Sequence, residues 1–195
     1  IEELGLDRRA TVVFLSDHGE EFQEHGSVMH EKLYATVTRI PLMIRLPGGR
    51  LARAVDEVVE SVDLMPTLLE LAGAPIPTGV QGSSLLPLLL GRPAEGPHVA
   101  FSESPFFGRQ RAVTLGGQRM IFTQKTGAVE LYDYRADPLE QSDLAGAQPA
   151  GIEPRRQLLE AWEAMVASSP VETAETGQQL DEETLEQLRA LGYVQ

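Results

Sequence analysis

The sequence contains no cysteine, which excludes disulfide bonds and thiolate metal ligands. A metal could therefore be bound only by Asp, Glu, His or hydroxyl groups, and the redox compartment stays open. No apolar run reaches the roughly 18 to 20 residues with which a helix crosses a bilayer. Basic residues are also few, because 29 acidic minus 16 basic residues give a net charge of −13. A nucleic acid or an anionic membrane surface would on average be repelled, so we expect neither nucleic acid as a partner nor a membrane segment in this chain.

The chain is nevertheless long enough to form a hydrophobic core. Its 195 residues with 42% apolar content suffice for one sizeable domain or for a core with a small appendage. The first residues, "IEELGLDRR", lack an initiator Met and resemble the end of a helix. We therefore expect the chain to start in mid-fold. An upstream targeting peptide would not be visible, and periplasmic and extracellular locations are both compatible with the sequence.

The first half of the sequence alternates between short buried strands and a helix. The β-branched run at 11–15 and the segment "PLMIRL" at 41–46 predict strands that are buried on both faces of a parallel or mixed sheet. Residues 63–73 predict a helix, with Asp63 as its N-cap and Leu68 on its packed face. A short helical turn is expected before Gly91.

The second half has a different pattern, with short alternating runs between residues 98 and 134 that are separated by glycine-containing turns. This pattern is typical of a small antiparallel sheet. Residues 153–168 predict an amphipathic helix that buries Trp162. A polar linker at 169–180 and a last short helix at 181–192 complete the prediction.

These elements predict an α/β fold in three parts. Residues 1–97 would form part of an α/β domain, and residues 98–168 a small antiparallel β subdomain with a packing helix. Residues 169–195 would form a linker and the terminal helix.

The stretch "SDHG" directly follows the first strand and contains the first candidate site. Ligands in open α/β sheets bind at the carboxyl ends of strands, and Asp17 and His18 lie at that edge. Gly19 permits the sharp turn that would bring both side chains onto one ion. An Asp oxygen with an imidazole nitrogen suits Mg²⁺, Mn²⁺ or Zn²⁺ better than Ca²⁺. The alternative is an ordinary turn in which the Asp caps the backbone.

Three of the four histidines fall between residues 18 and 30, and one of only two lysines follows at Lys32. Imidazoles and an ammonium group gathered beside a metal would suit an anionic substrate, which makes His25, His30 and Lys32 candidates for substrate binding or catalysis. Two alternatives stay open from the residues alone. His25 fits a loop histidine bonded to its own backbone equally well, and Lys32 could be a solvated surface residue.

Several motifs together resemble the carboxyl half of the sulfatase family, within the alkaline phosphatase superfamily. They are "SDHGEEFQEHG", the His/Lys cluster with "LY", "RIPLMIRLPGG", "SVDLMPTLLELAG", "QGSSLLPLLLG", "ELYDYRADPLEQSDLA" and "LRALGY". The resemblance covers nearly the whole chain in order and spacing. It implies the rear part of an alkaline-phosphatase-like mixed-sheet sandwich, followed by a small antiparallel sheet with a packing helix.

The resemblance also implies roles for residues. Asp17 and His18 would complete a divalent-metal site, commonly of Ca²⁺, and His30 and Lys32 would bind the sulfate oxygens or the leaving oxygen. The spacing in "GSVMHEKLY" leaves open which of these two takes which role. His25 and Lys32 are the expected substrate-binding residues. The metal would act as a Lewis acid on the ester oxygens.

The family's nucleophile, a formylglycine formed in an amino-terminal Cys/Ser-x-Pro-Ser-Arg motif, has no counterpart in this sequence. We therefore interpret the chain as a carboxyl-terminal fragment of a metal-dependent sulfatase, arylsulfatase-like in type, which hydrolyses a sulfate ester when whole and is inactive alone. Two alternatives remain: a phosphodiester or phosphonate monoester hydrolase of the same superfamily, and a non-catalytic binding or assembly module. The oligomeric state stays unknown.

Overall fold

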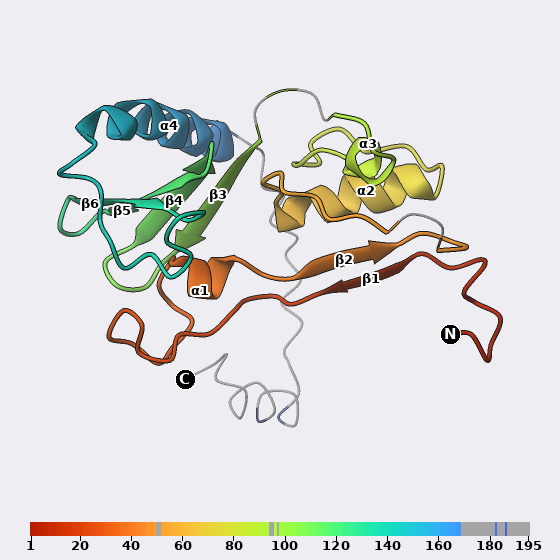
Figure 1. Cartoon of the computed structure of the whole chain (residues 1–195). Helices are drawn as coiled ribbons and strands as arrows, with labels where there is room; N and C mark the ends of the chain where they lie inside the picture. Colours follow the sequence, from red (N-terminus) through yellow and green to blue (C-terminus); the bar gives the residue numbers. More distant parts are fainter. Residues whose placement is uncertain (50–51, 94–95, 97, 169–181, 183–185, 187–195) are drawn as a thin grey trace.

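Two separate antiparallel sheets form the framework of the chain (Figure 1). One has two strands and the other has four, and each carries helices on its upper side in this view. No helix within the described residues is long and apolar enough to pass through a membrane. The structure is a computed structural model, and it describes residues 1–49, 52–93, 96, 98–168, 182 and 186.

The two-stranded sheet consists of β1 (Val12–Leu15) and β2 (Leu42–Arg45), which confirms both predicted strands. The pairing is antiparallel and sets Phe14 opposite Met43. These two side chains are 56% and 59% exposed, so the prediction that both faces of the strands are buried is wrong for the chain as it stands. The reason is that, within the described residues, β1 and β2 pair only with each other.

The predicted helix after β2 begins as a 3-10 turn, η1 (Ser61–Asp63), and continues as α2 (Leu64–Leu71). Asp63 stands at the N-cap position of α2, but its carboxylate makes no capping bond to that helix. It accepts instead from the backbone N–H groups of Glu60 (2.8 Å) and Ser83 (2.7 Å). The side chain predicted to cap α2 therefore ties the start of η1 to a loop 20 residues away.

The packed side of α2 also differs from the prediction. Leu68 is 42% exposed, whereas Thr67 is fully buried. The Thr67 hydroxyl donates to the Asp63 carbonyl (2.6 Å) and accepts from the N–H of Leu85 (2.8 Å), just before α3 (Leu86–Leu89). A buried hydroxyl of α2 thus bonds the residue that precedes α3.

The four-stranded sheet confirms the antiparallel prediction, with its strands side by side in chain order. The alternating run at residues 111–124 contributes to two of the strands. They are joined at a Gly116-Gly117 turn, where both residues have positive φ. The strands are β3 (Val99–Ser104), β4 (Gln110–Leu115), β5 (Gln118–Thr123) and β6 (Ala128–Asp133).

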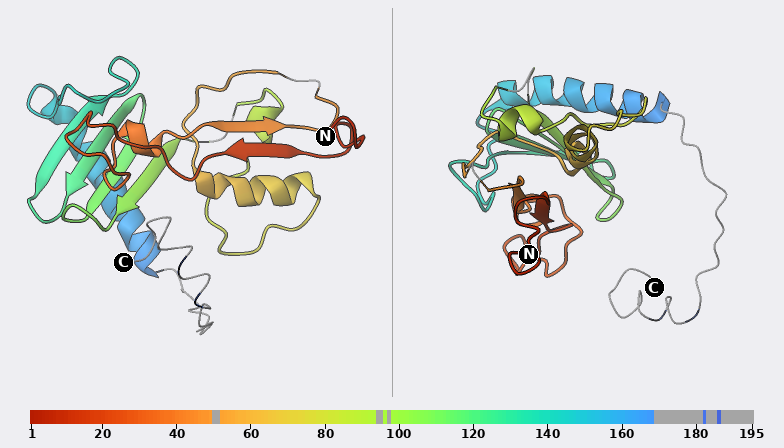
Figure 2. Two further views of the ribbon diagram at one scale, coloured as in Figure 1. Left: turned by 90° about the horizontal axis from the view of Figure 1, so that it is seen from below. Right: turned by 90° about the vertical axis from the view of Figure 1, so that its right-hand side faces the viewer.

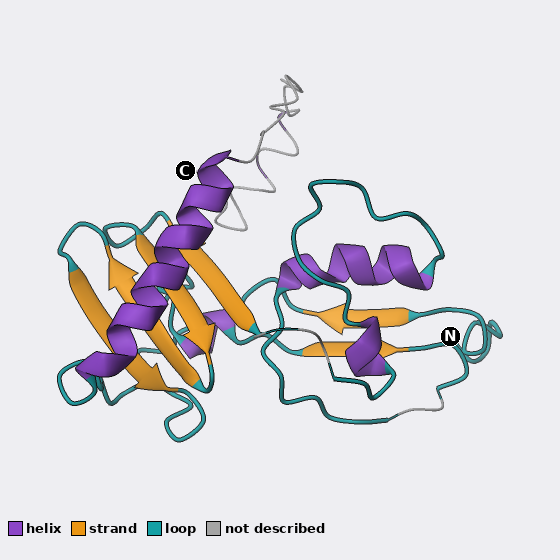
Figure 3. Ribbon diagram, turned by 90° about the horizontal axis from the view of Figure 1, so that it is seen from above, coloured by secondary structure: helices purple, strands orange, loops and turns teal. Residues whose placement is uncertain are grey.

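One face of this sheet is covered by α4 (Ile152–Ser168), which crosses the strands in Figure 3 and confirms the predicted amphipathic helix. Leu159 of α4 joins a cluster of sheet residues at the centre of this layer. Trp162 lies partly buried at the rim of the cluster and stacks on Phe101 with ring centroids 5.2 Å apart. The sheet residues of the cluster are Val113, Met120 and Leu131.

The opposite face of the four-stranded sheet is covered by the residues at the end of the loop that carries His18, His25 and His30. Leu33 and Tyr34 pack there, immediately before the short helix α1 (Ala35–Thr38), which the sequence did not predict. Figure 2 shows α1 lying against the four-stranded sheet. The chain thus leaves the two-stranded sheet after β1, reaches under the four-stranded sheet and returns to β2. The sheet residues that it contacts in this layer are Ala112, Ile121 and Tyr132.

The division at residues 97 and 98 stays a prediction. The predicted linker and terminal helix fall outside the described residues, apart from residues 182 and 186.

Candidate functional site

Asp17 and His18 follow β1 directly, and their side chains face each other. The Asp17 Oδ2 and His18 Nε2 atoms are 3.7 Å apart, and the backbone N–H of His18 donates to Asp17 Oδ1 (3.0 Å). The His18 Nδ1 lies 2.7 Å from the Gly19 carbonyl oxygen, which can only accept, so this nitrogen carries the proton. The Nε2 atom, which lies beside the Asp17 carboxylate, has no backbone partner of this kind among the described residues, and a neutral ring would offer its lone pair there, as in metal-binding histidines.

Gly19 is required by the close approach of this loop to α1. Its N–H donates to the Val37 carbonyl (2.7 Å), and a Cβ atom on Gly19 would lie 2.0 Å from the carbonyl oxygen of Thr36. Only glycine allows the two backbones to come this close. The position of Asp17 and His18 is consequently set by α1.

His30 is brought next to His18 from the far end of the loop. The two rings stack with centroids 4.1 Å apart, and His30 Nδ1 lies 3.4 Å from Glu20 Oε2. One ligand atom from each of His18, Glu20 and His30 lies within 4.8 Å of the others. The sequence analysis did not single out Glu20. Its position two residues after His18, in the same turn, was the signal that could have indicated it.

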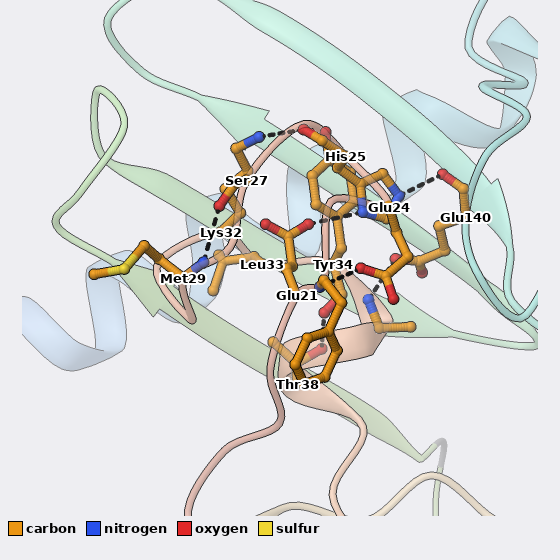
Figure 4. Close-up of polar contacts among 12 residues, drawn as sticks. Glu21, Glu24, His25, Ser27, Met29, Lys32, Leu33, Tyr34, Thr38 and Glu140 are labelled. Atoms are coloured by element: carbon orange, nitrogen blue, oxygen red, sulfur yellow. Dashed lines mark hydrogen bonds and ion pairs between the residues drawn. The ribbon is translucent and has the colours of Figure 1, made fainter.

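Lys32 has a different environment from His30. Its ammonium group donates to the His25 carbonyl (2.6 Å), and it lies 5.3 Å from the ring centroid of Phe107 and 5.9 Å from that of Tyr34. The carbonyl and the two rings thus engage the ammonium group, and Figure 4 shows its bond to the His25 carbonyl. Of the two residues predicted to serve catalysis, the structure brings His30 to the corner with Asp17, His18 and Glu20, the candidate metal corner, and holds Lys32 against His25.

His25 is enclosed within the protein, with its side chain only 9% exposed. Its Nδ1 lies 2.8 Å from a carboxylate oxygen of Glu21, and its Nε2 lies 3.1 Å from the carbonyl oxygen of Glu140. One face of the ring stacks on Tyr34 at 3.5 Å between centroids. Both ring nitrogens are therefore occupied by protein atoms, so the structure does not bring His25 together with Asp17 and His18 as a group free to contact a substrate.

Glu140 and Arg119 form the buried base on which this loop rests. The Glu140 side chain is fully buried, accepts from the N–H of Ala35 (2.7 Å) and lies 3.5 Å from Arg119 Nε. Burial raises the pKa of the Glu140 carboxyl, and the Arg119 charge opposes that rise. Arg119 also donates to the Leu33 carbonyl (3.2 Å) and to the hydroxyl of Thr38. Sequence reasoning missed both residues, because they lie far along the chain from the loop.

Tyr34 completes the buried side of the loop. Burial, reinforced by the neighbouring Glu130 carboxylate, raises the pKa of its hydroxyl. The hydroxyl therefore stays protonated and donates to Glu130 (3.0 Å). Tyr132, which meets Tyr34 edge to face at 6.0 Å, donates to the same carboxylate (3.1 Å).

A hollow lies beside the candidate metal corner and is bordered by the β3–β4 hairpin. Asp17, His18 and His30 line it together with Ser104 and Phe106 of the hairpin. The Ser104 hydroxyl donates to the backbone carbonyl of the residue after His30 (2.5 Å), and Phe106 is 52% exposed. The hollow beside these residues therefore has an apolar side chain at its rim.

Comparison with known proteins identifies relatives for most of the chain. A family model described as "N-sulphoglucosamine sulphohydrolase, C-terminal" matches residues 23–161. Arylsulfatase K of Gallus gallus is 30% identical over 171 residues, which cover 82% of this chain and 32% of that protein. Arylsulfatase K of Xenopus laevis is 31% identical over 169 residues, which cover 78% of this chain and 31% of that protein. The chain thus spans about a third of the length of these relatives.

Solved structures extend the similarity to the fold. A 2-O GAG sulfatase, BT1596, superposes with a TM-score of 0.73 at 28% identity, covering 83% of this chain and 37% of its own. A phosphonate monoester hydrolase from Silicibacter pomeroyi superposes with a TM-score of 0.69 at 25% identity, covering 89% of this chain and 38% of its own. These matches confirm the predicted α/β architecture of the alkaline-phosphatase-like type.

Proposed function

Because this chain belongs to the sulfatase family, we propose that it supplies the carboxyl-terminal side of the active site in a divalent-metal-dependent sulfuric ester hydrolase. The family match and the arylsulfatase K relatives support the reaction class. The single observation that carries the assignment of the site is the convergence of Asp17, His18 and His30 at one corner of the fold.

Asp17 and His18 are the proposed metal ligands. Their donor atoms, 3.7 Å apart, fit two neighbouring ligands of one ion after a small side-chain adjustment, because metal–ligand distances of about 2.0 to 2.6 Å place adjacent donors roughly 3 to 3.5 Å apart. A bound divalent ion supplies a positive charge that stabilises the ester oxygens as negative charge develops on them. Two protein ligands are fewer than the about 6 to 8 that Ca²⁺ takes, so we expect weak binding by this chain alone.

The family resemblance favours Ca²⁺, whereas the nitrogen donor of His18 is compatible with Mg²⁺, Mn²⁺ or Zn²⁺. A nitrogen-rich donor set would result if His30 turned toward the ion. It would consist of His18 Nε2, a Glu20 oxygen and a His30 nitrogen. Comparing these four ions on one preparation would decide the metal.

His30 is the proposed acid that protonates the leaving alkoxide. Its Nδ1 lies 3.4 Å from Glu20 Oε2, and its side chain is 38% exposed, so that a substrate can reach it. Lys32 remains the second candidate for this role and for sulfate binding, together with His25. Both would have to leave their present partners first, since the Lys32 ammonium and both nitrogens of the His25 ring are bonded within the protein.

The nucleophile, a formylglycine in the family, is the part that this chain does not supply. Without a nucleophile the ester cannot be displaced in two steps, so we expect the isolated chain to be inactive. The expected substrate is a sulfate ester. A related sulfatase structure is described as a complex with its substrate, D-glucosamine-2-N,6-O-disulfate.

A phosphonate monoester hydrolase is the second candidate. The similarity to the Silicibacter pomeroyi enzyme covers 89% of this chain, and tetrahedral sulfur and phosphorus esters have similar shapes. The residues at the metal corner do not distinguish the two esters.

The decisive experiment expresses the whole protein that carries this chain and compares 4-nitrophenyl sulfate with a 4-nitrophenyl phosphonate monoester, with and without a metal chelator. We expect chelator-sensitive hydrolysis with preference for the sulfate. Preference for the phosphonate would select the second candidate. Absence of hydrolysis of either ester by the metal-loaded whole protein would contradict both and favour a binding or assembly module.

A further inference from the structure

The strongest unexplained feature is the enclosure of His25. A histidine on a loop that carries a metal corner could be expected to face solvent or substrate. Here both ring nitrogens point at protein oxygens, one from Glu21 and one from Glu140, which is 115 residues away in the sequence. Glu21 and His25 lie on the loop after β1, and Glu140 lies on the connection after β6 (Figure 4).

The hydrogen-bond partners determine what the ring must do. The Glu140 carbonyl can only accept, so the His25 Nε2 donates. The Nδ1 atom lies 2.8 Å from a carboxylate oxygen of Glu21, so both ring nitrogens are within hydrogen-bond distance of a protein oxygen. Glu21 is fully buried, and its other carboxylate oxygen has no hydrogen-bond partner within the described residues. The imidazole is thus the group that compensates this buried carboxylate.

Glu140 holds the loop at a second point. Its carboxylate accepts from the N–H of Ala35 at the start of α1, and the carbonyl of Val37 in α1 accepts from the N–H of Gly19. One residue of the β6–α4 connection therefore bonds His25 through its backbone and α1 through its side chain. Its own backbone adopts φ +52°, a conformation that costs a non-glycine residue free energy and that surrounding contacts must maintain.

We propose that His25 and Glu140 are positioning residues, through which the four-stranded sheet holds the loop with Asp17, His18 and His30 in the geometry that binds the metal. This inference rests on the proposed function only for its metal readout. Neither residue touches the reacting atoms, and each acts by fixing one point of the loop, His25 at its middle and Glu140 at its return into α1.

The test uses the 195-residue chain with the variant His25→Ala and the matched control Leu159→Ala. Leu159 is 4% exposed in the cluster under α4 and does not contact the loop, so its truncation weakens the same subdomain without touching His25 or Glu140. Amide hydrogen exchange is measured at Gly19 and Ala35, whose N–H groups report on the two ends of the loop. Conditions are chosen so that both variants have equal global stability.

We expect His25→Ala to speed exchange at Gly19 and Ala35 by about tenfold or more relative to Leu159→Ala, because it opens the loop locally. Calorimetric titration with Mn²⁺ should show affinity about 10- to 100-fold below that of the control, as for other residues that orient metal ligands. Equal exchange at these two amides in the two variants would overturn the inference. If the whole protein that carries this chain binds no Mn²⁺, the metal assignment fails, while the exchange comparison still decides the positioning role.

Two further measurements test the positioning role if His25→Ala does not fold. Glu21→Gln keeps the size of the side chain and removes its charge, and we expect it to speed exchange at the same amides relative to Leu159→Ala; equal exchange in these two variants would contradict the inference. In the unsubstituted chain, NMR of the imidazoles should show a His25 Nε2 proton in slow exchange, with His30 as the internal reference. A His25 ring proton that exchanges as fast as that of His30 would contradict the bond to Glu140.

Discussion

Two histidines of one loop, His25 and His30, are five residues apart and have opposite environments. His25 is 9% exposed, with both nitrogens bonded to protein oxygens. His30 is 38% exposed, with one nitrogen 3.4 Å from Glu20 and its ring stacked on His18. Each has a glutamate partner, so residue type does not separate them. What separates them is whether both ring nitrogens already have a protein partner, which is why we propose a chemical role for His30 and a positioning role for His25.

The largest effect that tests this difference is on stability. His25→Ala should lower the free energy of unfolding by about 3 to 5 kcal/mol, because it leaves the Glu21 carboxylate buried without its partner. His30→Ala should change it by less than about 0.5 kcal/mol, as for other surface substitutions. Urea denaturation of both variants measures the difference. Equal losses would mean that the two histidines are not distinct in the way the structure shows.

For catalysis by the whole protein, we expect the exposed residues of the candidate site to matter more than the buried ones. Asp17→Ala should lower kcat/KM for an aryl sulfate by about 100- to 1,000-fold, since it removes a group that stabilises developing charge through the metal. The control is Asp56→Ala, a change at an exposed carboxylate in the segment after β2. Steady-state kinetics at saturating metal give the ratio, and retention of activity within a few-fold would show that Asp17 is not a ligand.

A measurement at alkaline pH tests the burial of Tyr34, which stacks on His25, and of its neighbour Tyr132. Burial raises the pKa of Tyr34 and Tyr132 in the folded chain, so above the unfolded value of about 10 the unfolded state loses protons first. Stability should therefore be intact below pH 10 and fall above it, by about 1.4 kcal/mol per pH unit for each of these tyrosines. Urea midpoints between pH 9 and 11 measure the slope. Tyr34→Phe should flatten it, and an unchanged slope in that variant would contradict the burial of the hydroxyl.

The smallest effect extends the same rule to leucines. Leu68→Ala should cost less than about 1 kcal/mol, because the side chain is 42% exposed, whereas Leu159→Ala, at 4% exposed, should cost about 2 to 5 kcal/mol. Thermal melting of the two variants checks the contrast. A cost for Leu68→Ala as large as that for Leu159→Ala would indicate that another surface covers α2 in solution.

Local pattern predicted most of the secondary structure. The β-branched run gave β1, the alternating runs gave the four-stranded sheet, and the apolar spacing that included Trp162 gave α4 within one residue of its bounds. These elements depend on neighbours in the sequence, which is why sequence alone suffices. The helix α1 was missed because it has only four residues and because Glu140, 105 residues away, bonds its first N–H.

The candidate site was predictable as a group of residues and not as a geometry. Asp17, His18 and His30 were named from the sequence, and the structure brings them together. The separate environments of His25 and Lys32 could not be foreseen, because they depend on Glu140 and Phe107, which lie more than 70 residues further along the chain. The same limit explains Leu68 and Phe14, whose burial depends on partners outside their own segments.

The exposed pair formed by Phe14 and Met43 has a practical consequence for handling the protein. A two-stranded ribbon with open backbone edges and large apolar side chains is a template for adding further strands from other molecules. Preparations of this chain should therefore be kept dilute and checked by light scattering, and a charged residue introduced at Met43 is the simplest way to improve solubility while leaving the histidine loop intact.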